Sequence, residues 1–253
     1  MIVIPMAGRS SRFFDAGYNE PKYMLKAHGR SLFNHSVKSF EKYFALERFI
    51  FITNAEFNAS SFVAVECVSL GIVDYVIVEL EEPTRGQAET VYLGLSKNNL
   101  TVDEHLVIFN IDTIRPGLDL VAIRDHKSSS GYLETFIGSG ANWSNILPKD
   151  TRVQTVALVA EKQEISKYCC TGLYVWKSYI EFIRVFEKLR DQNISIGSEE
   201  NELYVAPMYN VLIAEGQEVH YTIVDVHDVV FAGVPAEYED FKVDRGSSDD
   251  RDI

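Results

Sequence analysis

The chain has 253 residues, 46% of them hydrophobic, so it can bury a sizeable core and lies near the upper size of a single α/β domain. Its 24 Lys and Arg against 37 Asp and Glu give a formal net charge of −13, which argues against duplex nucleic acid or an anionic membrane as a partner. The three cysteines, two of them adjacent, offer neither a disulfide framework nor a spaced metal set, and they fit a reducing compartment.

Strand-length apolar runs alternate with longer amphipathic stretches through the first half of the chain. The expected strands are Ile2 to Ile4, Arg48 to Thr53, Tyr75 to Val78 and His105 to Phe109, and the expected helices are Ser31 to Phe44, Ser60 to Leu70 and Thr90 to Lys97. These strands are apolar on both faces, as strands at the centre of a sheet are. The alternation predicts an α/β fold in which helices cover a mostly parallel sheet.

The pattern changes after residue 131. Shorter alternating runs at Leu133 to Ile137, Val153 to Val159 and Leu173 to Trp176 predict a mixed or antiparallel extension, and helices are expected at Tyr179 to Gln192 and Asn210 to Glu215. We therefore expect a single domain over residues 1–242, with two halves that meet near residue 130. Residues 243–253 are rich in Gly, Ser and Asp and predict a flexible tail.

The first 22 residues carry the strongest functional signal. The strand that starts at Ile2 runs into a loop of small and basic residues, and Pro21-Lys22 follows shortly after it. A residue such as Gly8 lets a backbone turn point its N–H groups at an anion. Arg9, Arg12 and Lys22 add cations to an otherwise acidic chain. The segment predicts a polyphosphate site, although Gly8 and Arg12 taken alone would indicate a simple turn.

This segment resembles the opening of the sugar nucleotidylyltransferases, also called nucleoside-diphosphate-sugar pyrophosphorylases. These enzymes join a nucleoside triphosphate to a phosphorylated acceptor and release pyrophosphate. Ala7-Gly8, Arg12 and Pro21-Lys22 match, in order and spacing, the family's Gly-containing loop, its downstream Arg and its Pro-Lys pair. The resemblance covers roughly residues 1–241 and implies a three-layer α/β/α fold, Rossmann-like and GT-A-like.

The resemblance also implies roles for the halves and for this segment. Residues 1–130 would bind the nucleotide and residues 131–242 the acceptor. Arg12 and Lys22 would be catalytic, and the loop residues that would bind the nucleotide are Ala7, Gly8, Arg9 and Ser10.

A second cluster lies at residues 82–90, between the third strand and its helix. In the family this loop reads the nucleobase, so Gly86 and Gln87 are expected to bind the nucleotide. Gly86 permits close backbone approach, and the Gln87 amide offers a donor and an acceptor to a base edge. The simpler interpretation is a polar loop whose Thr90 caps the helix. Gln87 could read a pyrimidine or a purine, and the family favours a pyrimidine.

A third cluster, Asn110-Ile111-Asp112, follows the fourth strand directly, at the sheet end where ligands gather in open α/β proteins. The family carries an Asp here that holds Mg²⁺ against the phosphates. Asp112 is therefore the expected catalytic metal ligand, Asn110 a nucleotide contact and Mg²⁺ the cofactor. Otherwise Asp112 would cap a turn.

Many family members carry a second metal-binding Asp two residues before the Gly of a late Gly-x-Pro segment. In this chain that segment begins at Gly233, and Phe231 occupies the acidic position. Asp225 or Asp228 is then the expected second ligand. A single carboxylate with phosphate oxygens and waters would also complete a Mg²⁺ shell.

The family's acceptor half is matched by two segments further along. Glu161 and Lys162 end an apolar run, and Thr171-Gly172 lies inside the next. By resemblance all four bind the acceptor: Lys162 would pair with its phosphate, and Glu161 with its hydroxyls or another donor. Taken alone, a Glu-Lys pair is more often a solvated surface pair.

We therefore expect a Mg²⁺-dependent nucleotidyltransferase that acts on a sugar 1-phosphate. Its partners would be a nucleoside triphosphate and a phosphorylated small molecule, with no nucleic acid or membrane. The alternatives are a cytidylyltransferase acting on a non-sugar phosphate such as phosphoglutamine, a GT-A-type glycosyltransferase that uses Asn110-Ile111-Asp112 as its metal motif, and a non-catalytic nucleotide-binding relative.

Two further expectations concern the biosynthetic pathway and the cellular location of the protein. Trp143-Ser144 and the stretch from Tyr204 to Tyr209 resemble the branch of the family found in capsule and surface-polysaccharide pathways. The apolar start is too short and lacks the basic leader of a signal peptide, and no apolar run approaches the ~20 residues that span a bilayer. We expect a cytoplasmic protein.

Overall fold

The computed structural model describes residues 1–98, 100, 102–124, 129–192 and 202–243. Its main sheet contains β1 (Ile2–Pro5), β4 (Arg48–Asn54), β5 (Asp74–Leu80), β6 (Leu106–Phe109), β8 (Gly131–Ile137), β9 (Ser144–Asp150), β10 (Thr155–Glu161), β11 (Tyr168–Trp176) and β12 (Val219–Val224). The strand order is β5-β4-β1-β6-β11-β8-β12-β10-β9. Two small sheets pair β2 (Lys26–Ala27) with β3 (Arg30–Ser31), and β7 (Thr113–Ile114) with β13 (Val230–Phe231).

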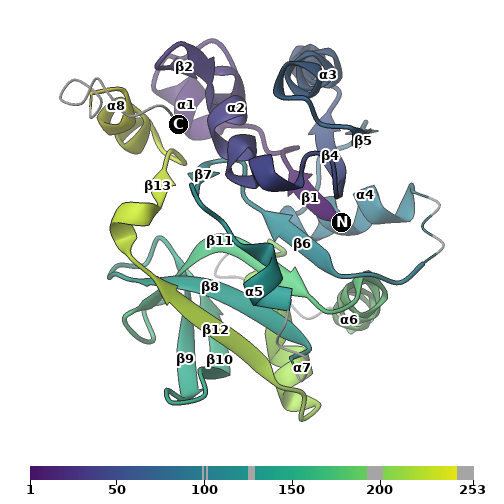
Figure 1. The fold of residues 1–253 in the computed structure, drawn as a ribbon, viewed down its shortest axis with the longest axis vertical. Helices are drawn as coiled ribbons and strands as arrows, with labels where there is room; N and C mark the ends of the chain where they lie inside the picture. The colour runs from purple at the N-terminus through teal and green to yellow at the C-terminus, as the bar shows by residue number, and fades with distance from the viewer. Residues whose placement is uncertain (99, 101, 125–128, 193–201, 244–253) are drawn as a thin grey trace.

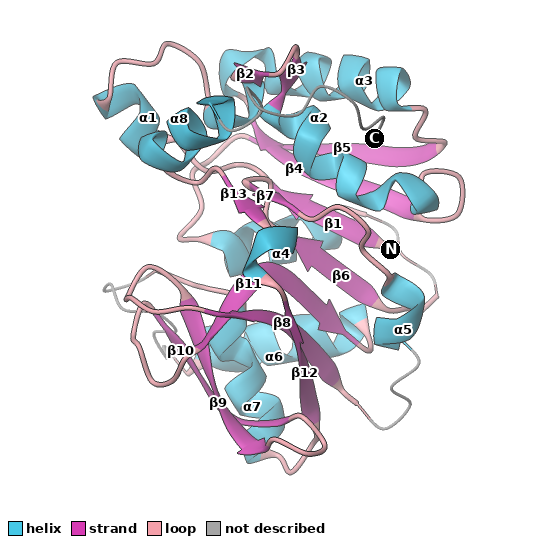
Figure 2. Cartoon of the chain, turned by 60° about the vertical axis from the view of Figure 1, so that its left-hand side comes forward, coloured by secondary structure: helices cyan, strands magenta, loops and turns pink. Residues whose placement is uncertain are grey.

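The strands of the first half, β5, β4, β1 and β6, are all parallel to their neighbours within this group, as the sequence predicts. Their side chains alternate between two apolar clusters on opposite faces. Val3 packs with Val91 of α4 (Gln87–Ser96), whereas Ile4 packs with Val63 of α3 (Ala59–Leu70). Helices therefore cover both faces here, and the carboxyl ends of β1 and β6 lie side by side (Figure 2).

The second half is built differently. β11 runs antiparallel to β6, and β9 pairs with both β10 and β11, so that β11, β8, β12, β10 and β9 close into a five-stranded barrel. Closure leaves no free edge in this group, and register shifts near Val156 allow β10 to bend. The sheet is therefore mixed, as predicted, but it is not mostly parallel, and a three-layer arrangement is not confirmed for the whole chain.

The remaining helices are α1 (Ser11–Asp15), α2 (Leu32–Val37), α5 (Leu120–Arg124), α6 (Tyr179–Asp191), α7 (Tyr209–Ala214) and α8 (Pro235–Val243). The single helix expected from Ser31 to Phe44 is divided. Ser31 caps α2 by accepting a hydrogen bond from the Asn34 N–H at 3.0 Å, and a 3-10 segment, Lys38–Tyr43, follows. The backbone leaves helical geometry at Phe40, with φ of −105°.

The end of the described chain returns to its beginning. α8 lies beside α1 and β2 (Figure 1), and a third apolar cluster joins residues of the two segments, including Phe13, Leu25, Tyr238 and Phe241. This return brings β13 against β7, next to the end of β6. Of the expected tail only Val243 is described, in α8, and the rest lies outside the described residues. Among the described helices none is long and apolar enough to cross a membrane.

Candidate active site

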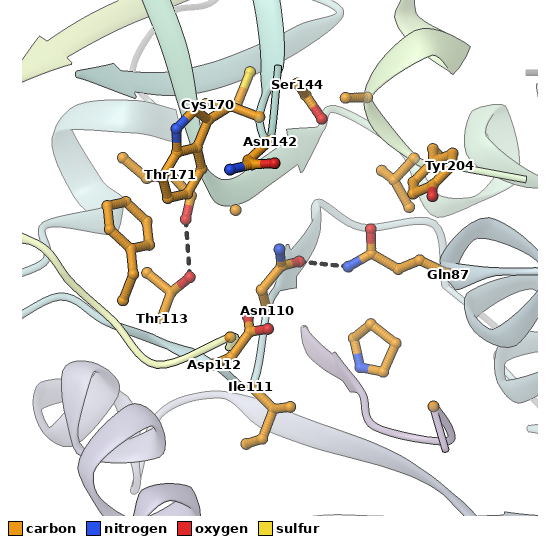
Figure 3. Close-up of a pocket in the computed structure, with 18 of the residues that line it drawn as sticks. Gln87, Asn110, Ile111, Asp112, Thr113, Asn142, Ser144, Cys170, Thr171 and Tyr204 are labelled. Atoms are coloured by element: carbon orange, nitrogen blue, oxygen red, sulfur yellow. Dashed lines mark hydrogen bonds between the residues drawn. The ribbon is translucent and has the colours of Figure 1, made fainter. Parts of the chain in front are cut away.

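A cavity of about 590 Å³ opens where the carboxyl ends of β1 and β6 meet the barrel. Its wall includes nine of the residues singled out from the sequence: Gly8, Arg12, Lys22, Gln87, Asn110, Asp112, Glu161, Thr171 and Gly172. They come from segments far apart in the chain and line one cavity, and Figure 3 shows Gln87, Asn110, Asp112 and Thr171 around it. The predicted nucleotide and acceptor segments therefore converge.

Lys22 and Asp112 meet at the centre of this wall. The Lys22 Nζ lies 2.5 Å from the Asp112 Oδ2, and the two side chains are 23% and 24% exposed. The backbone N–H of Lys22 donates to the Ser10 Oγ at 3.2 Å, so Ser10 fixes the loop without lining the cavity. Arg12 lines the cavity, and its guanidinium has no ion-pair partner among the described residues. A free cation beside a Lys-Asp pair suits a polyanionic ligand.

Asp112 also contacts the segment between β13 and α8, near the end of the described chain. The Ala232 N–H donates to the Asp112 backbone carbonyl at 2.8 Å. A Cβ at Gly233 would lie 2.9 Å from the Asp112 Oδ2, so a side chain here would displace the carboxylate. The Glu237 carboxylate accepts the Gly233 N–H at 2.8 Å and also lines the cavity. The sequence analysis missed Glu237, the third residue of α8, which accepts the N–H groups of Gly233 and Val234 as the Glu of a capping box does, although Val234 stands where the box has Ser or Thr.

Asn110 links the nucleotide and acceptor walls. Its side-chain oxygen accepts a hydrogen bond from the Gln87 amide (Figure 3). Its backbone N–H donates to the Gly172 carbonyl at 3.1 Å. Gly172 has φ of +99°, and a Cβ there would lie 2.7 Å from the Asn110 Nδ2. Glycine is therefore required both by backbone conformation and by the position of the Asn110 amide.

The acceptor wall contains a half-buried carboxylate, Glu161. The β9–β10 register sets Glu161 opposite Ser144, whose hydroxyl donates to the Glu161 carboxylate. Burial raises the pKa of the Glu161 carboxyl, an effect that the Ser144 hydrogen bond partly offsets. Cys170 and Tyr174 complete this wall, and burial raises the pKa of both groups, which keeps them neutral. Tyr174 was not singled out from the sequence because it reads there as a core residue of β11.

Lys162 does not line the cavity. Its Nζ donates to the Tyr204 hydroxyl, lies 4.9 Å from the centre of that ring and lies 3.6 Å from the Glu202 carboxylate. Tyr204 and Glu202 do line the cavity, so Lys162 is one layer behind it. Glu202 carried no sequence signal, since nothing in its neighbourhood indicates a turn toward β10.

Several other predicted residues lie outside the cavity lining: Ala7, Arg9, Ser10, Gly86, Asp225 and Asp228. The Gly86 loop is instead tied to Leu203, whose N–H donates to the Arg85 carbonyl at 2.7 Å. Asp225 accepts the His227 N–H at 3.0 Å in a turn before β13, and Asp228 is exposed. The strand is therefore not shifted in a way that brings either carboxylate to Asp112.

Comparison with known structures identifies the family. A crystal structure of a nucleoside-diphosphate-sugar pyrophosphorylase from Vibrio cholerae RC9 is 46% identical, covers 96% of this chain and 99% of that one, and gives a TM-score of 0.89. The chain belongs to this family. No protein-family model and no curated protein matches the sequence.

More distant pyrophosphorylase-fold structures share the architecture alone. One is a Bacillus anthracis protein described as a glucose-1-phosphate thymidylyltransferase, 15% identical over 99% of this chain and 96% of that one, with a TM-score of 0.74. Another is the inositol-1-phosphate CTP transferase from T. maritima, 16% identical over 98% and 96%, with a TM-score of 0.71. The family resemblance predicted from the sequence is confirmed, and so is a mixed α/β single-domain fold.

Proposed function

We propose that the chain transfers the nucleotidyl group of a nucleoside triphosphate to a phosphorylated acceptor and releases pyrophosphate. Membership of the pyrophosphorylase family supports this reaction class. The observation that carries the proposal is the convergence of Arg12, Lys22 and Asp112 on one cavity that continues to Glu161. The end of the cavity that contains Arg12, Lys22 and Asp112 suits a triphosphate. The end that contains Glu161 suits the part of the acceptor that lies beyond its phosphate.

The reaction that fits this site is an in-line displacement at the α-phosphorus. A bond forms from an acceptor phosphate oxygen to the α-phosphorus as the bond from that phosphorus to the bridging oxygen breaks, and pyrophosphate leaves. The acceptor phosphate is already anionic, so no protein nucleophile is required. Catalysis then consists of positioning two groups that repel each other and neutralising the charge that builds. Arg12 and Lys22 would supply that charge.

The residues present fit a Mg²⁺ ion, which we propose as cofactor. Asp112 would hold it, because Mg²⁺ binds through one or two carboxylates together with substrate phosphates and waters. The described residues contain no group of three or more His, Cys, Asp or Glu that could form an all-protein cage, which suits that sparse ligation. When bound, the ion neutralises charge on the phosphate oxygens. Since Asp225 and Asp228 lie outside the cavity lining, phosphate oxygens and waters are our proposed remaining ligands.

For the substrates we propose a pyrimidine nucleotide. The distant relatives named above use thymidylyl and CTP chemistry on phosphorylated acceptors, which supports this choice. Gln87 would contact the base from the rim of the cavity. A place in capsule or surface-polysaccharide synthesis and a cytoplasmic location stay predictions of the sequence.

Pyrophosphate release tests the proposed function directly. The protein would be mixed with Mg²⁺, each of the four ribonucleoside triphosphates or dTTP, and a panel of phosphorylated acceptors, with pyrophosphatase and phosphate detection. Turnover should require one triphosphate and one acceptor together. Consumption of a nucleotide sugar without a triphosphate would favour a glycosyltransferase, and nucleotide binding without any turnover would indicate a non-catalytic relative.

A further inference from the structure

The acceptor wall contains a cluster of three aromatic rings. Trp143 and Phe231 have ring centroids 4.4 Å apart, and each lies 5.2 Å from the ring of Phe136. They come from three separate segments, namely β8, the β8–β9 connection and β13. Trp143 and Phe231 line the cavity. Phe231 also pairs with Thr113 in the small sheet, so the cluster begins one residue from Asp112.

Next to this cluster lies Glu161, a half-buried carboxylate that lines the cavity. Ser144 directly follows Trp143 and donates to Glu161, and the Trp143 carbonyl accepts the N–H of Lys162 at 3.1 Å. No Lys, Arg or His nitrogen of the described residues lies within ion-pair distance of the Glu161 carboxylate; burial raises its pKa and Lys162 lowers it from further away, while the Lys162 Nζ donates to Tyr204 and lies 3.6 Å from Glu202. A carboxylate partly removed from water is destabilised unless it is paired, so a cationic ligand would stabilise Glu161.

The charges that line the cavity are separated by position. The cations Arg12, in α1, and Lys22, at the start of the 3-10 segment Lys22–Met24, follow β1 in the chain, whereas Glu161 and Glu202 lie on the barrel side, with Tyr204. Figure 3 shows Ser144 and Tyr204 across the cavity from Asp112. An acceptor whose phosphate points to Lys22 would therefore extend away from cations and toward a carboxylate flanked by aromatic rings.

We propose that the acceptor is a phosphorylated small molecule that carries a cationic amine, with the ammonium group seated on Trp143 and Phe231 and paired with Glu161. This inference rests on the proposed function and names its substrate class. Ammonium groups bind over aromatic faces, most strongly over Trp, when they are removed from water. The same cation would form an ion pair with the half-buried Glu161 carboxylate, which has none with the described residues. A neutral sugar would satisfy the hydrogen-bonding capacity of Glu161 but would leave its charge unpaired.

A matched pair of acceptors tests the proposal on the unaltered protein. Phosphocholine and 3,3-dimethylbutyl phosphate have nearly the same shape, and only the first carries a positive charge. With the accepted triphosphate, kcat/KM for pyrophosphate release should be at least about tenfold higher for phosphocholine, because only phosphocholine places a cation over the aromatic rings. Phosphoethanolamine tests a smaller ammonium, and glucose 1-phosphate and inositol 1-phosphate test neutral polyols.

Two outcomes would overturn the inference while leaving the proposed function intact. One is equal use of phosphocholine and its neutral isostere, and the other is turnover with the polyol phosphates and none with either ammonium compound. Absence of pyrophosphate release with every acceptor would instead contradict the proposed function. The failures of the two claims are thus distinguishable.

Substitution of Glu161 tests whether the amine of the acceptor binds at this carboxylate. Glu161→Gln keeps the shape and the Ser144 hydrogen bond but removes the charge, so KM for an ammonium acceptor should rise about tenfold or more while KM for the triphosphate stays constant. Glu164→Gln is the matched control, because Glu164 follows on the same connection, is exposed and does not line the cavity. Unchanged discrimination between phosphocholine and its isostere in Glu161→Gln would exclude Glu161 as the partner.

Discussion

The two ends of the cavity are built by different parts of the fold and carry opposite charge. The nucleotide end is formed by loops at the carboxyl ends of parallel strands, and its cations Arg12 and Lys22 face the ligand space. The acceptor end is formed by a closed barrel, and its cation Lys162 is occupied by Glu202 and Tyr204. The difference indicates that the residues at the carboxyl ends of the parallel strands carry out nucleotidyl transfer, whereas the residues of the barrel select the acceptor.

The nucleotide end and the acceptor end of the cavity meet at the Lys22–Asp112 ion pair. Lys22 and Asp112 lie 2.5 Å apart where β6 ends, and β13 of the returning chain closes over them. Two anionic substrates would repel each other unless positive charge lies between them. The positions of Lys22 and Asp112 should therefore tolerate the least change, and substitutions of these two residues should lower activity most.

The largest expected effect follows removal of either member of this pair. Lys22→Ala or Asp112→Ala should lower kcat by about 10²–10³, the range observed when a preorganised charge-stabilising group is removed. Pyrophosphate release measures the loss, and circular dichroism with thermal unfolding checks the fold. Lys26→Ala, which changes an exposed lysine on β2, should leave kcat unaltered. Full activity in both active-site variants would remove the Lys22–Asp112 ion pair from the mechanism.

A smaller effect is expected from Arg12, which acts on one substrate only. Arg12→Ala should raise KM for the triphosphate about tenfold or more, because hydrogen bonds to charged groups contribute about 1.5–3 kcal/mol. It should also lower kcat, though less than Lys22→Ala or Asp112→Ala, because Arg12 would neutralise part of the charge that builds on the phosphates. KM for the acceptor should change little. Arg9→Ala is the comparison, since Arg9 is exposed and does not line the cavity, and it should give the weaker effect. An equal rise in both KM values would contradict the separation of the two ends.

Gly172 offers a test with a closely matched control. Gly172→Ala and Gly140→Ala share a positive φ, +99° and +101°, but only at Gly172 does an added Cβ meet a neighbour, the Asn110 Nδ2. Both variants should lose about 1–3 kcal/mol of unfolding free energy from backbone strain. Activity, measured well below the unfolding temperature, should fall several-fold in Gly172→Ala alone. Equal activity in the two variants would show that the Asn110 position is not needed.

The smallest expected effect is a pH dependence confined to the acceptor end. Burial raises the pKa of Glu161, so as pH falls its carboxylate becomes protonated earlier than an ordinary glutamate. KM for an ammonium acceptor should therefore rise a few-fold on mild acidification, while KM for the triphosphate should not follow it. The titratable groups that face Glu161 are Lys162, Glu202, Cys170 and Tyr174. A phosphate monoester also titrates, with a second pKa of about 6, so the quantity to follow is the ratio of KM for phosphocholine to KM for its neutral isostere. In Glu161→Gln the pH dependence of this ratio should disappear, and its persistence would exclude Glu161 as the cause.

The sequence by itself determined much of the nucleotide half. Apolar runs buried on both faces predict β1, β4 and β6 because a central strand has no polar face. β5 was expected to be of the same kind, but it lies at the sheet edge and its residues from Tyr75 to Ile77 are only partly buried. Asp112 could be located because a polar residue directly after such a run must emerge at the sheet's carboxyl edge. Gly8, Arg12 and Lys22 lie close together in the chain, so their common site could be predicted from the sequence without knowledge of tertiary contacts.

The acceptor half depended on contacts that sequence spacing does not encode. Alternating runs predict strands, but they do not specify that β9 pairs with β11 as well as β10, which is what closes the barrel. Nor do they give the direction of a long side chain, so Lys162 was expected in the cavity and lies behind it. The meeting of Trp143, Phe231 and Glu161 joins three distant segments through strand register and the return of the chain. Local pattern fixes which residues form an element, whereas long-range pairing decides which side chains share a cavity.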